Sequence, residues 1–226
     1  MRQLRSVVSF AFAALAAAAA AQQPASPGAQ EDHVRGVVAS VAGDTVTVRT
    51  ADGRSQTLKL ADKTRVSLAS KADLNAIQKN AYVGVTAVEE RGGTLRALEV
   101  HVFPETARGA GEGHRPWDLR PGSSMTNARV SGVEPANGGS AGSSMTNATV
   151  SDVAGAAGGK KLELIYKDGK QTVIVPPQAP VVALEAADRS AIRAGEHVFA
   201  AGARQGDGSV AVDRMVVGKG AVVPPM

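Results

Sequence analysis

Histidine and carboxylate side chains that could bind a metal gather near the middle of the chain. Glu112, His114 and Asp118 stand close together in a glycine-rich stretch, and His101 precedes them. Imidazole and carboxylate groups together suit Zn²⁺ or Cu²⁺. Their spacing matches no metal-binding motif, so we predict no metal ion and no other cofactor, and keep these four residues as the candidates if a metal is bound. His33 lies in the predicted leader, where a solvated side chain is expected.

Nucleophilic and phosphate-binding residues form no complete catalytic set. Ser123-Ser124 and Ser143-Ser144 offer hydroxyl groups, but no histidine stands in a context that would make it their base. The glycine-rich run at 109–113 resembles part of a phosphate-binding loop, yet no Gly-Lys-Ser/Thr follows it. We therefore predict no catalytic residues and no enzymatic activity, and keep a hydrolase only as a third alternative.

The single tryptophan has two possible roles. Trp117 lies in the run Arg115-Pro116-Trp117. A large ring in a loop must be covered, so it either packs across a seam between two barrels or anchors a partner. Met125 and Met145 occupy equivalent places in two copies of a short motif, as apolar plugs or as soft ligands for Cu(I). These five residues are our candidates for a seam or a partner-binding surface.

The first residues have the composition of a secretory signal peptide. Arg2 and Arg5 form a basic region, residues 7–21 form an alanine-rich apolar run, and small residues precede Gln22. The run is shorter than the roughly 20 residues that span a bilayer. We therefore predict export to the periplasm or the medium, with no stable membrane insertion after the signal is removed.

The overall composition argues against several classes of protein. The chain has no cysteine, which excludes disulfides and thiolate metal sites. Arg2 and Arg5 account for two of the four net positive charges, so the exported chain is nearly neutral. Aromatic residues make up only 3% of the chain, whereas surfaces for single-stranded nucleic acid combine stacking rings with basic grooves. We therefore predict no nucleic-acid partner.

Residues 34–103 have the pattern of a small β-barrel. Alternating apolar and polar side chains predict three strands first, at 34–41, 45–50 and 56–60. The spacing then becomes helical over 70–80, and two longer strands follow at 82–90 and 94–103. Three strands, a helix and two strands is the order expected for an OB-type, five-stranded Greek-key barrel.

Residues 148–219 repeat this pattern in the same order. For example, Asp188-Arg-Ser-Ala-Ile192 corresponds to Asp73-Leu-Asn-Ala-Ile77. In the last strand of each block the apolar residues change parity once, near Leu98 and near Asp213. Because a one-residue shift turns every later side chain to the opposite face, we predict a β-bulge at both places. His101 is then expected to point away from the core.

A stretch rich in glycine, proline and serine connects the two blocks. It carries the motif Gly-Ser-Ser-Met-Thr-Asn-Ala at 122–128, and the motif recurs at 142–148. We expect the second copy to begin the second barrel and the first copy to be an additional strand at a barrel edge or across the seam. The predicted division is signal peptide 1–21, disordered leader 22–33, barrel 34–103, connecting stretch 104–147, barrel 148–219 and tail 220–226.

Several short segments carry a resemblance to known proteins. They are Gly36-Val37-Val38, Asp73-Leu74, Tyr82-Val83-Gly84-Val85, Gly113-His-Arg-Pro-Trp-Asp118 and Met145-Thr-Asn-Ala-Thr-Val150. In these the chain resembles a group of bacterial exported proteins of unknown function with OB-like β-barrel domains, some of which bear a metal-transporter permease label.

We therefore predict an all-β fold with short helices, formed by two tandem five-stranded OB-like Greek-key barrels. The predicted function is that of a non-enzymatic binding or scaffold protein of the bacterial cell envelope. Its partner would be an unidentified protein or small molecule. The alternative is a periplasmic metal-handling or metal-transport accessory protein that uses His101 and His114.

Overall fold

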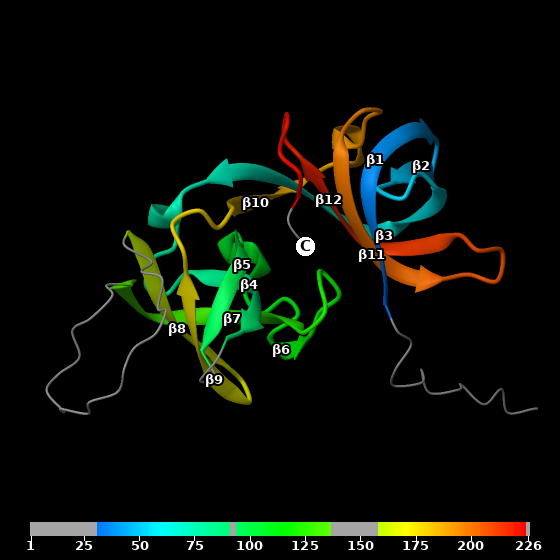
Figure 1. Ribbon diagram of the computed structural model, residues 1–226. Helices are drawn as coiled ribbons and strands as arrows, with labels where there is room; N and C mark the ends of the chain where they lie inside the picture. Colours follow the sequence, from blue (N-terminus) through cyan, green and yellow to red (C-terminus); the bar gives the residue numbers. More distant parts are fainter. Residues whose placement is uncertain (1–30, 91–93, 137–157, 225–226) are drawn as a thin grey trace, which may run out of the picture.

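The computed structural model describes residues 31–90, 94–136 and 158–224 (Figure 1). Within these ranges the chain is built from strands, and its helices are single 3-10 turns, so the all-β class is confirmed. No helix in the described ranges is long and apolar enough to span a bilayer. The predicted signal peptide, residues 22–30 of the predicted leader, and the second motif copy with Met145 lie outside the described residues.

The strands of the described chain belong to one hydrogen-bonded sheet, which closes on itself in two places. In chain order they are β1 (Asp32–Ala42), β2 (Thr45–Thr50), β3 (Ser55–Ala72), β4 (Tyr82–Glu89), β5 (Leu95–Val102), β6 (Gly113–Pro116), β7 (Ser123–Ala136), β8 (Gly159–Tyr166), β9 (Gly169–Val175), β10 (Val181–Ala187), β11 (His197–Arg204) and β12 (Val210–Gly218). The 3-10 turns are η1 (Leu74–Ala76), η2 (Glu105–Ala107) and η3 (Arg189–Ala191).

The first closure joins the first three strands of the described chain to its last two. β1 pairs with β2 and β11, β2 with β3, and β11 with β12, and the parallel pairing of β12 with β3 completes a five-stranded barrel. The alternation in β2 and β3 turns Val46, Val48, Leu58 and Leu60 inward. The other buried residues of this core are Val34, Val38, Val66, Ile192, Val198, Ala200, Val210, Val212, Met215 and Val217.

The second closure joins the five strands from the middle of the chain. β4 pairs with β5 and β7, and β8 with β7 and β9, all antiparallel. A short parallel contact of Leu95 and Arg96 with Val173 and Ile174 links β5 to β9 and closes the ring. Its buried core residues are Ile77, Val83, Val85, Ala87, Leu95, Ala97, Val100, Ala128, Val130, Leu162, Leu164, Val173, Val175 and Val181.

The two blocks of sequence exchange their second halves, so the prediction that residues 34–103 and residues 148–219 each close a barrel of their own is wrong. β5 pairs with β9 and β10 of the second block, and β4 pairs with β7 of the connecting stretch. β11 and β12 pair with β1 and β3 of the first block. The chain crosses between the rings through β3, which is 18 residues long, and through β10. These two segments pair antiparallel in the centre of the molecule (Figure 1). Because both blocks carry the same pattern, each offers the other equivalent strand edges.

The first copy of the repeated motif supplies a strand of the second ring. Met125-Thr-Asn-Ala128 lies in β7, with β4 on one side and β6 on the other, and the rest of β7 pairs with β8. The expectation that the first copy is only an additional strand is therefore wrong, since β7 links β4 to β8 in the second ring. The expectation for the second copy concerns residues outside the described ranges.

Both predicted β-bulges are confirmed. Leu98 has no partner on β4, where the register passes from Glu99 opposite Thr86 to Ala97 opposite Ala87. Asp213 is skipped in the same way opposite β11. The predicted helix over 70–80 is wrong, because β3 continues to Ala72 and only η1 follows. Here the Asp73 carboxylate accepts a hydrogen bond from the Asn75 backbone N–H at 2.7 Å, an N-cap that holds a single turn.

Candidate ligand cavity

A cavity of about 480 Å³ lies between the two rings of strands. One wall comes from β3, β10 and β12, and the other from β5, β6, β7 and the segment around η2. The residues that matter for its chemistry are Arg65, His101, Phe103, Arg115, Trp117, Met125, Asn127, Leu184 and Arg214. Its size falls within the range of sites for small organic molecules.

His101 is a buried histidine in the wall of this cavity. The bulge at Leu98 lets Val100 enter the core of the second ring and leaves His101 on the outer face of β5, as expected from the parity of the strand. Its side chain is 1% exposed, yet its Nε2 atom has no hydrogen-bond partner. The Glu99 carboxylate lies 3.6 Å from this nitrogen, and it accepts a hydrogen bond from the Thr86 hydroxyl at 2.7 Å. His101 Nε2 is thus a buried polar atom in need of a partner.

Asn127 supplies a second buried polar atom from β7. Its Nδ2 donates to the Ala110 carbonyl oxygen at 3.2 Å, whereas its Oδ1 has no partner. The neighbouring strand provides room for this amide at Gly84. A Cβ atom there would lie 2.7 Å from Asn127 Oδ1 and 3.0 Å from the Phe103 ring. Glycine at position 84 therefore leaves this oxygen its space beside the cavity.

Trp117 is partly buried where the two rings of strands meet. Its ring centroid lies 4.3 Å from that of His33 and 6.3 Å from that of Phe199, both of the first barrel. It packs against a buried cluster formed by Ala69, Val182, Leu184, Phe199, Ala201 and Val216. The Trp117 backbone is held to Ser123 by hydrogen bonds of 2.8 and 3.0 Å. Its Nε1 atom is buried without a partner, which makes it the third such atom in the cavity wall.

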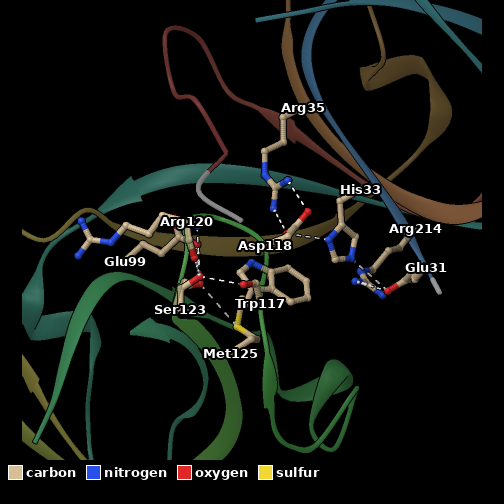
Figure 2. A network of polar contacts seen from close by, with 11 residues as sticks. Glu31, His33, Arg35, Glu99, Trp117, Asp118, Arg120, Ser123, Met125 and Arg214 are labelled. Carbon is tan, nitrogen blue, oxygen red and sulfur yellow. Dashed lines mark hydrogen bonds and ion pairs between the residues drawn. The ribbon is translucent and has the colours of Figure 1, made fainter. Parts of the chain in front are cut away.

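The loop after Trp117 is fastened to the first barrel by ionic contacts (Figure 2). Asp118 accepts hydrogen bonds from Arg35 at 2.7 and 3.1 Å and from His33 Nδ1 at 2.8 Å. Burial raises the pKa of Asp118, but the hydrogen bonds from Arg35 and His33 outweigh it and bring that pKa to about 2. The expectation that His33 is solvated is wrong. Its side chain is 9% exposed, because β1 begins at Asp32 and carries it under the Trp117 ring.

Arg115 and Arg214 place two positive charges at the cavity. Arg214 is neutralised by Glu31, to which it donates hydrogen bonds of 2.7 and 3.0 Å. Arg115 donates to the Gly111 carbonyl oxygen at 2.8 Å, lies over the Trp117 ring at 5.6 Å, and makes no ion pair with a described residue. Burial lowers the pKa of Arg115, and the charge of Arg214 adds to this effect. The charge of Glu31 offsets these effects only in part, so among the described residues Arg115 is a partly desolvated cation without an ion-pair partner.

The structure does not bring the four candidate metal ligands together. Only His101 lines the cavity. His114 is hydrogen-bonded through Nδ1 to the Thr126 hydroxyl at 2.8 Å, Glu112 accepts from the backbone N–H of Lys167 at 3.0 Å, and Asp118 holds the loop as described. Over residues 31–90, 94–136 and 158–224, no group of three or more His, Cys, Asp or Glu side chains is placed to hold a metal ion.

The five seam or partner candidates lie mostly at the cavity. Arg115, Trp117 and Met125 line it, and Pro116 ends β6 opposite Ser124. Met125 is 3% exposed, with the Thr86 hydroxyl 3.8 Å from its sulfur. Met145 lies outside the described residues.

Sequence reasoning missed Asn127, Phe199 and Arg214 as parts of the site. One usable indication was the uninterrupted apolar run Val198-Phe-Ala-Ala201, because a strand that is apolar on both sides is covered on both faces.

No protein-family model, no curated protein and no solved structure matches this chain. The function is therefore inferred from the cavity itself.

Proposed function

We propose that this protein is an exported, non-enzymatic binding protein of the bacterial cell envelope that holds a small molecule between its two rings of strands. The observation that carries the proposal is the presence of three buried polar atoms without hydrogen-bond partners in the residues around one cavity. They are His101 Nε2, Trp117 Nε1 and Asn127 Oδ1. Leaving a buried donor or acceptor unpaired costs about 1–3 kcal/mol. A ligand that pairs with these atoms recovers that free energy on binding.

The architecture that we propose for the two rings is a pair of OB-like barrels. In the numbering of each five-strand repeat, both rings have the order first, second, third, fifth, fourth, and in both the fifth strand runs parallel to the third. This agreement, between rings assembled from exchanged halves, supports a common Greek-key origin. Barrels of this type commonly bind their ligands on an outer face and its loops, which is where the cavity lies.

Export is proposed from the composition of the first residues. Arg2 and Arg5, the apolar run over 7–21 and the small residues before Gln22 support cleavage by a signal peptidase. The native protein is expected to begin near Gln22 when its N-terminus is sequenced from a periplasmic or secreted fraction. A native chain that begins at Met1 and stays in the cytoplasm would contradict export.

Binding in the cavity is tested with the neutral fluorescent probe N-phenyl-1-naphthylamine. Because Trp117 is the only tryptophan and lies in the cavity wall, a bound probe accepts its excitation energy. We expect one bound probe per chain with efficient energy transfer from Trp117. The blocking variant is Ala186→Phe, since this exposed alanine of β10 lines the cavity, and the matched control is Ala203→Phe on β11, an exposed alanine away from it.

The proposal expects the blocking variant to lose the probe and the control to retain it. A wild-type protein that takes up no probe at a single site contains a cavity filled by water alone, and the proposal then fails. Equal binding by both variants would place the probe elsewhere on the surface and would also refute it. Circular dichroism of both variants confirms that each remains folded.

A further inference from the structure

The charge of the cavity wall points to the class of the ligand. Arg65, Arg115 and Arg214 line the cavity, and no Asp or Glu is among the described residues that line it. Glu31 neutralises Arg214 from outside this wall, with hydrogen bonds to both of its terminal nitrogens. Glu99 places a carboxylate 3.6 Å from His101 Nε2, behind this wall. The positive charge at the wall itself comes from Arg65 and Arg115, and it favours anions beside them.

Arg115 is the cation best placed to meet such an anion. One of its nitrogens donates to Gly111, which fixes the guanidinium and leaves further N–H donors available. The group lies over the Trp117 ring, so it is held by the ring as well as by the backbone. Arginine recognises planar carboxylate groups through two parallel hydrogen bonds. A fixed and partly desolvated guanidinium spends little conformational entropy when it binds one.

The rest of the wall suits an apolar body. Phe103, Trp117, Met125 and Leu184 present aromatic, thioether and aliphatic surfaces to the same cavity. His101 Nε2 and Asn127 Oδ1 add one unpaired polar atom each, beside this apolar surface. A small number of polar groups on an apolar lining is the usual composition of a site that orients an organic ligand.

We infer that the ligand is an organic acid, in which a carboxylate pairs with Arg115 and a flat apolar body lies against Trp117, Phe103 and Met125. His101 and Asn127 then contact polar atoms of the ligand's body. This inference rests on the proposed binding function and adds the chemical class of the ligand to it. It also assigns a specificity role to Arg115, since a neutral ligand of the same shape leaves that charge unpaired.

The test compares two ligands of the same shape in displacing N-phenyl-1-naphthylamine. One is 2-naphthoate, and the other is its neutral isostere 2-naphthamide. A hydrogen-bonded charge contributes about 1.5–3 kcal/mol, so 2-naphthoate is expected to displace the probe at concentrations about tenfold to a hundredfold lower. In Arg115→Gln, for which the affinity of the neutral probe is measured first, this preference is expected to disappear. The control Arg193→Gln changes an exposed arginine away from the cavity and retains the preference.

The outcomes separate the inference from the function on which it rests. If the probe binds but both naphthalenes displace it equally, the organic-acid class is refuted and the binding function stands. If 2-naphthoate is preferred to the same degree in Arg115→Gln, the assignment of the carboxylate to Arg115 is overturned. If no probe binds at one site in the wild type, the binding function itself fails.

Discussion

Replacing Trp117 by alanine tests whether its indole side chain holds the two rings of strands together. A tryptophan side chain has about 150–250 Å² of surface to bury, and that of Trp117 is partly buried against His33 and Phe199. With roughly two-thirds of this area removed from water, at about 25 cal/mol per Å², the ring contributes about 2–4 kcal/mol. This is at or below the about 3–5 kcal/mol expected for a fully buried aromatic ring. We therefore expect Trp117→Ala to lower the free energy of unfolding by about 2–4 kcal/mol.

The measurement is urea unfolding followed by far-ultraviolet circular dichroism, because the variant has no tryptophan to report by fluorescence. Trp117→Phe keeps an aromatic ring at the same place and is expected to lose about half as much. Leu119→Ala, a partly buried change in the same loop, controls for the loop itself. A loss below about 1 kcal/mol in Trp117→Ala, or one equal to that of the loop control, would show that the indole does not hold the two rings of strands together.

Three further predictions follow from the strand exchange, the ionic contacts of the loop and the packing beside the cavity. Val37 and His197 lie opposite each other on β1 and β11, so the double variant Val37→Cys/His197→Cys is expected to form a disulfide. Val37→Cys/Tyr82→Cys joins the positions expected to pair without the exchange and is expected to form none. Mass spectrometry after oxidation distinguishes the two results. Because the pKa of Asp118 is lowered to about 2, its stabilising contacts are complete above about pH 4 and are lost as the pH falls towards 2. The difference in unfolding free energy between wild type and Asp118→Asn should shrink over that interval, and a difference independent of pH would contradict the assignment. Gly84→Ala is expected to lower the free energy of unfolding by about 1–3 kcal/mol through overpacking against Asn127 and Phe103. An unchanged free energy of unfolding would show that these two side chains move aside.

Local features of the fold were predictable because neighbouring residues determine them. Strict alternation identified β2 and the first part of β3, and the change of parity identified both bulges before any pairing was known. The helix over 70–80 failed because its spacing competes with the long strand β3, whose second half is held by β10 and β12. Tertiary pairing decided the outcome against weak local preference.

The exchange of halves could not be predicted from pattern alone. Two repeats of the same pattern present equivalent strand edges, so closing each barrel within a block or between blocks satisfies the same hydrogen bonds. The choice depends on which connections can span the distance, and β3 and β10 run side by side between the rings. The repeated motif was misplaced for the same reason, since both copies have nearly the same residues and one of them occupies β7.

The candidate site was only partly predictable. Arg115 and Trp117 drew attention by residue type, and both lie in the cavity. Parity placed His101 on the outer face of its strand, but that face lies against the cavity between the two rings and is not exposed to solvent. Phe199 and Arg214 belong to β11 and β12, a strand pair far from Trp117 in the sequence. Their position beside Trp117 depends on the exchange of strands, so the pattern of neighbouring residues could not predict it.

The central claim, that the space between the two rings of strands binds an organic acid, is tested most directly by a crystal structure grown with 2-naphthoate. We predict density for one naphthoate in the cavity, with its carboxylate paired to Arg115 and its rings against Trp117. A cavity that contains only ordered water at saturating 2-naphthoate, with His101 and Asn127 paired to those waters, would contradict the claim.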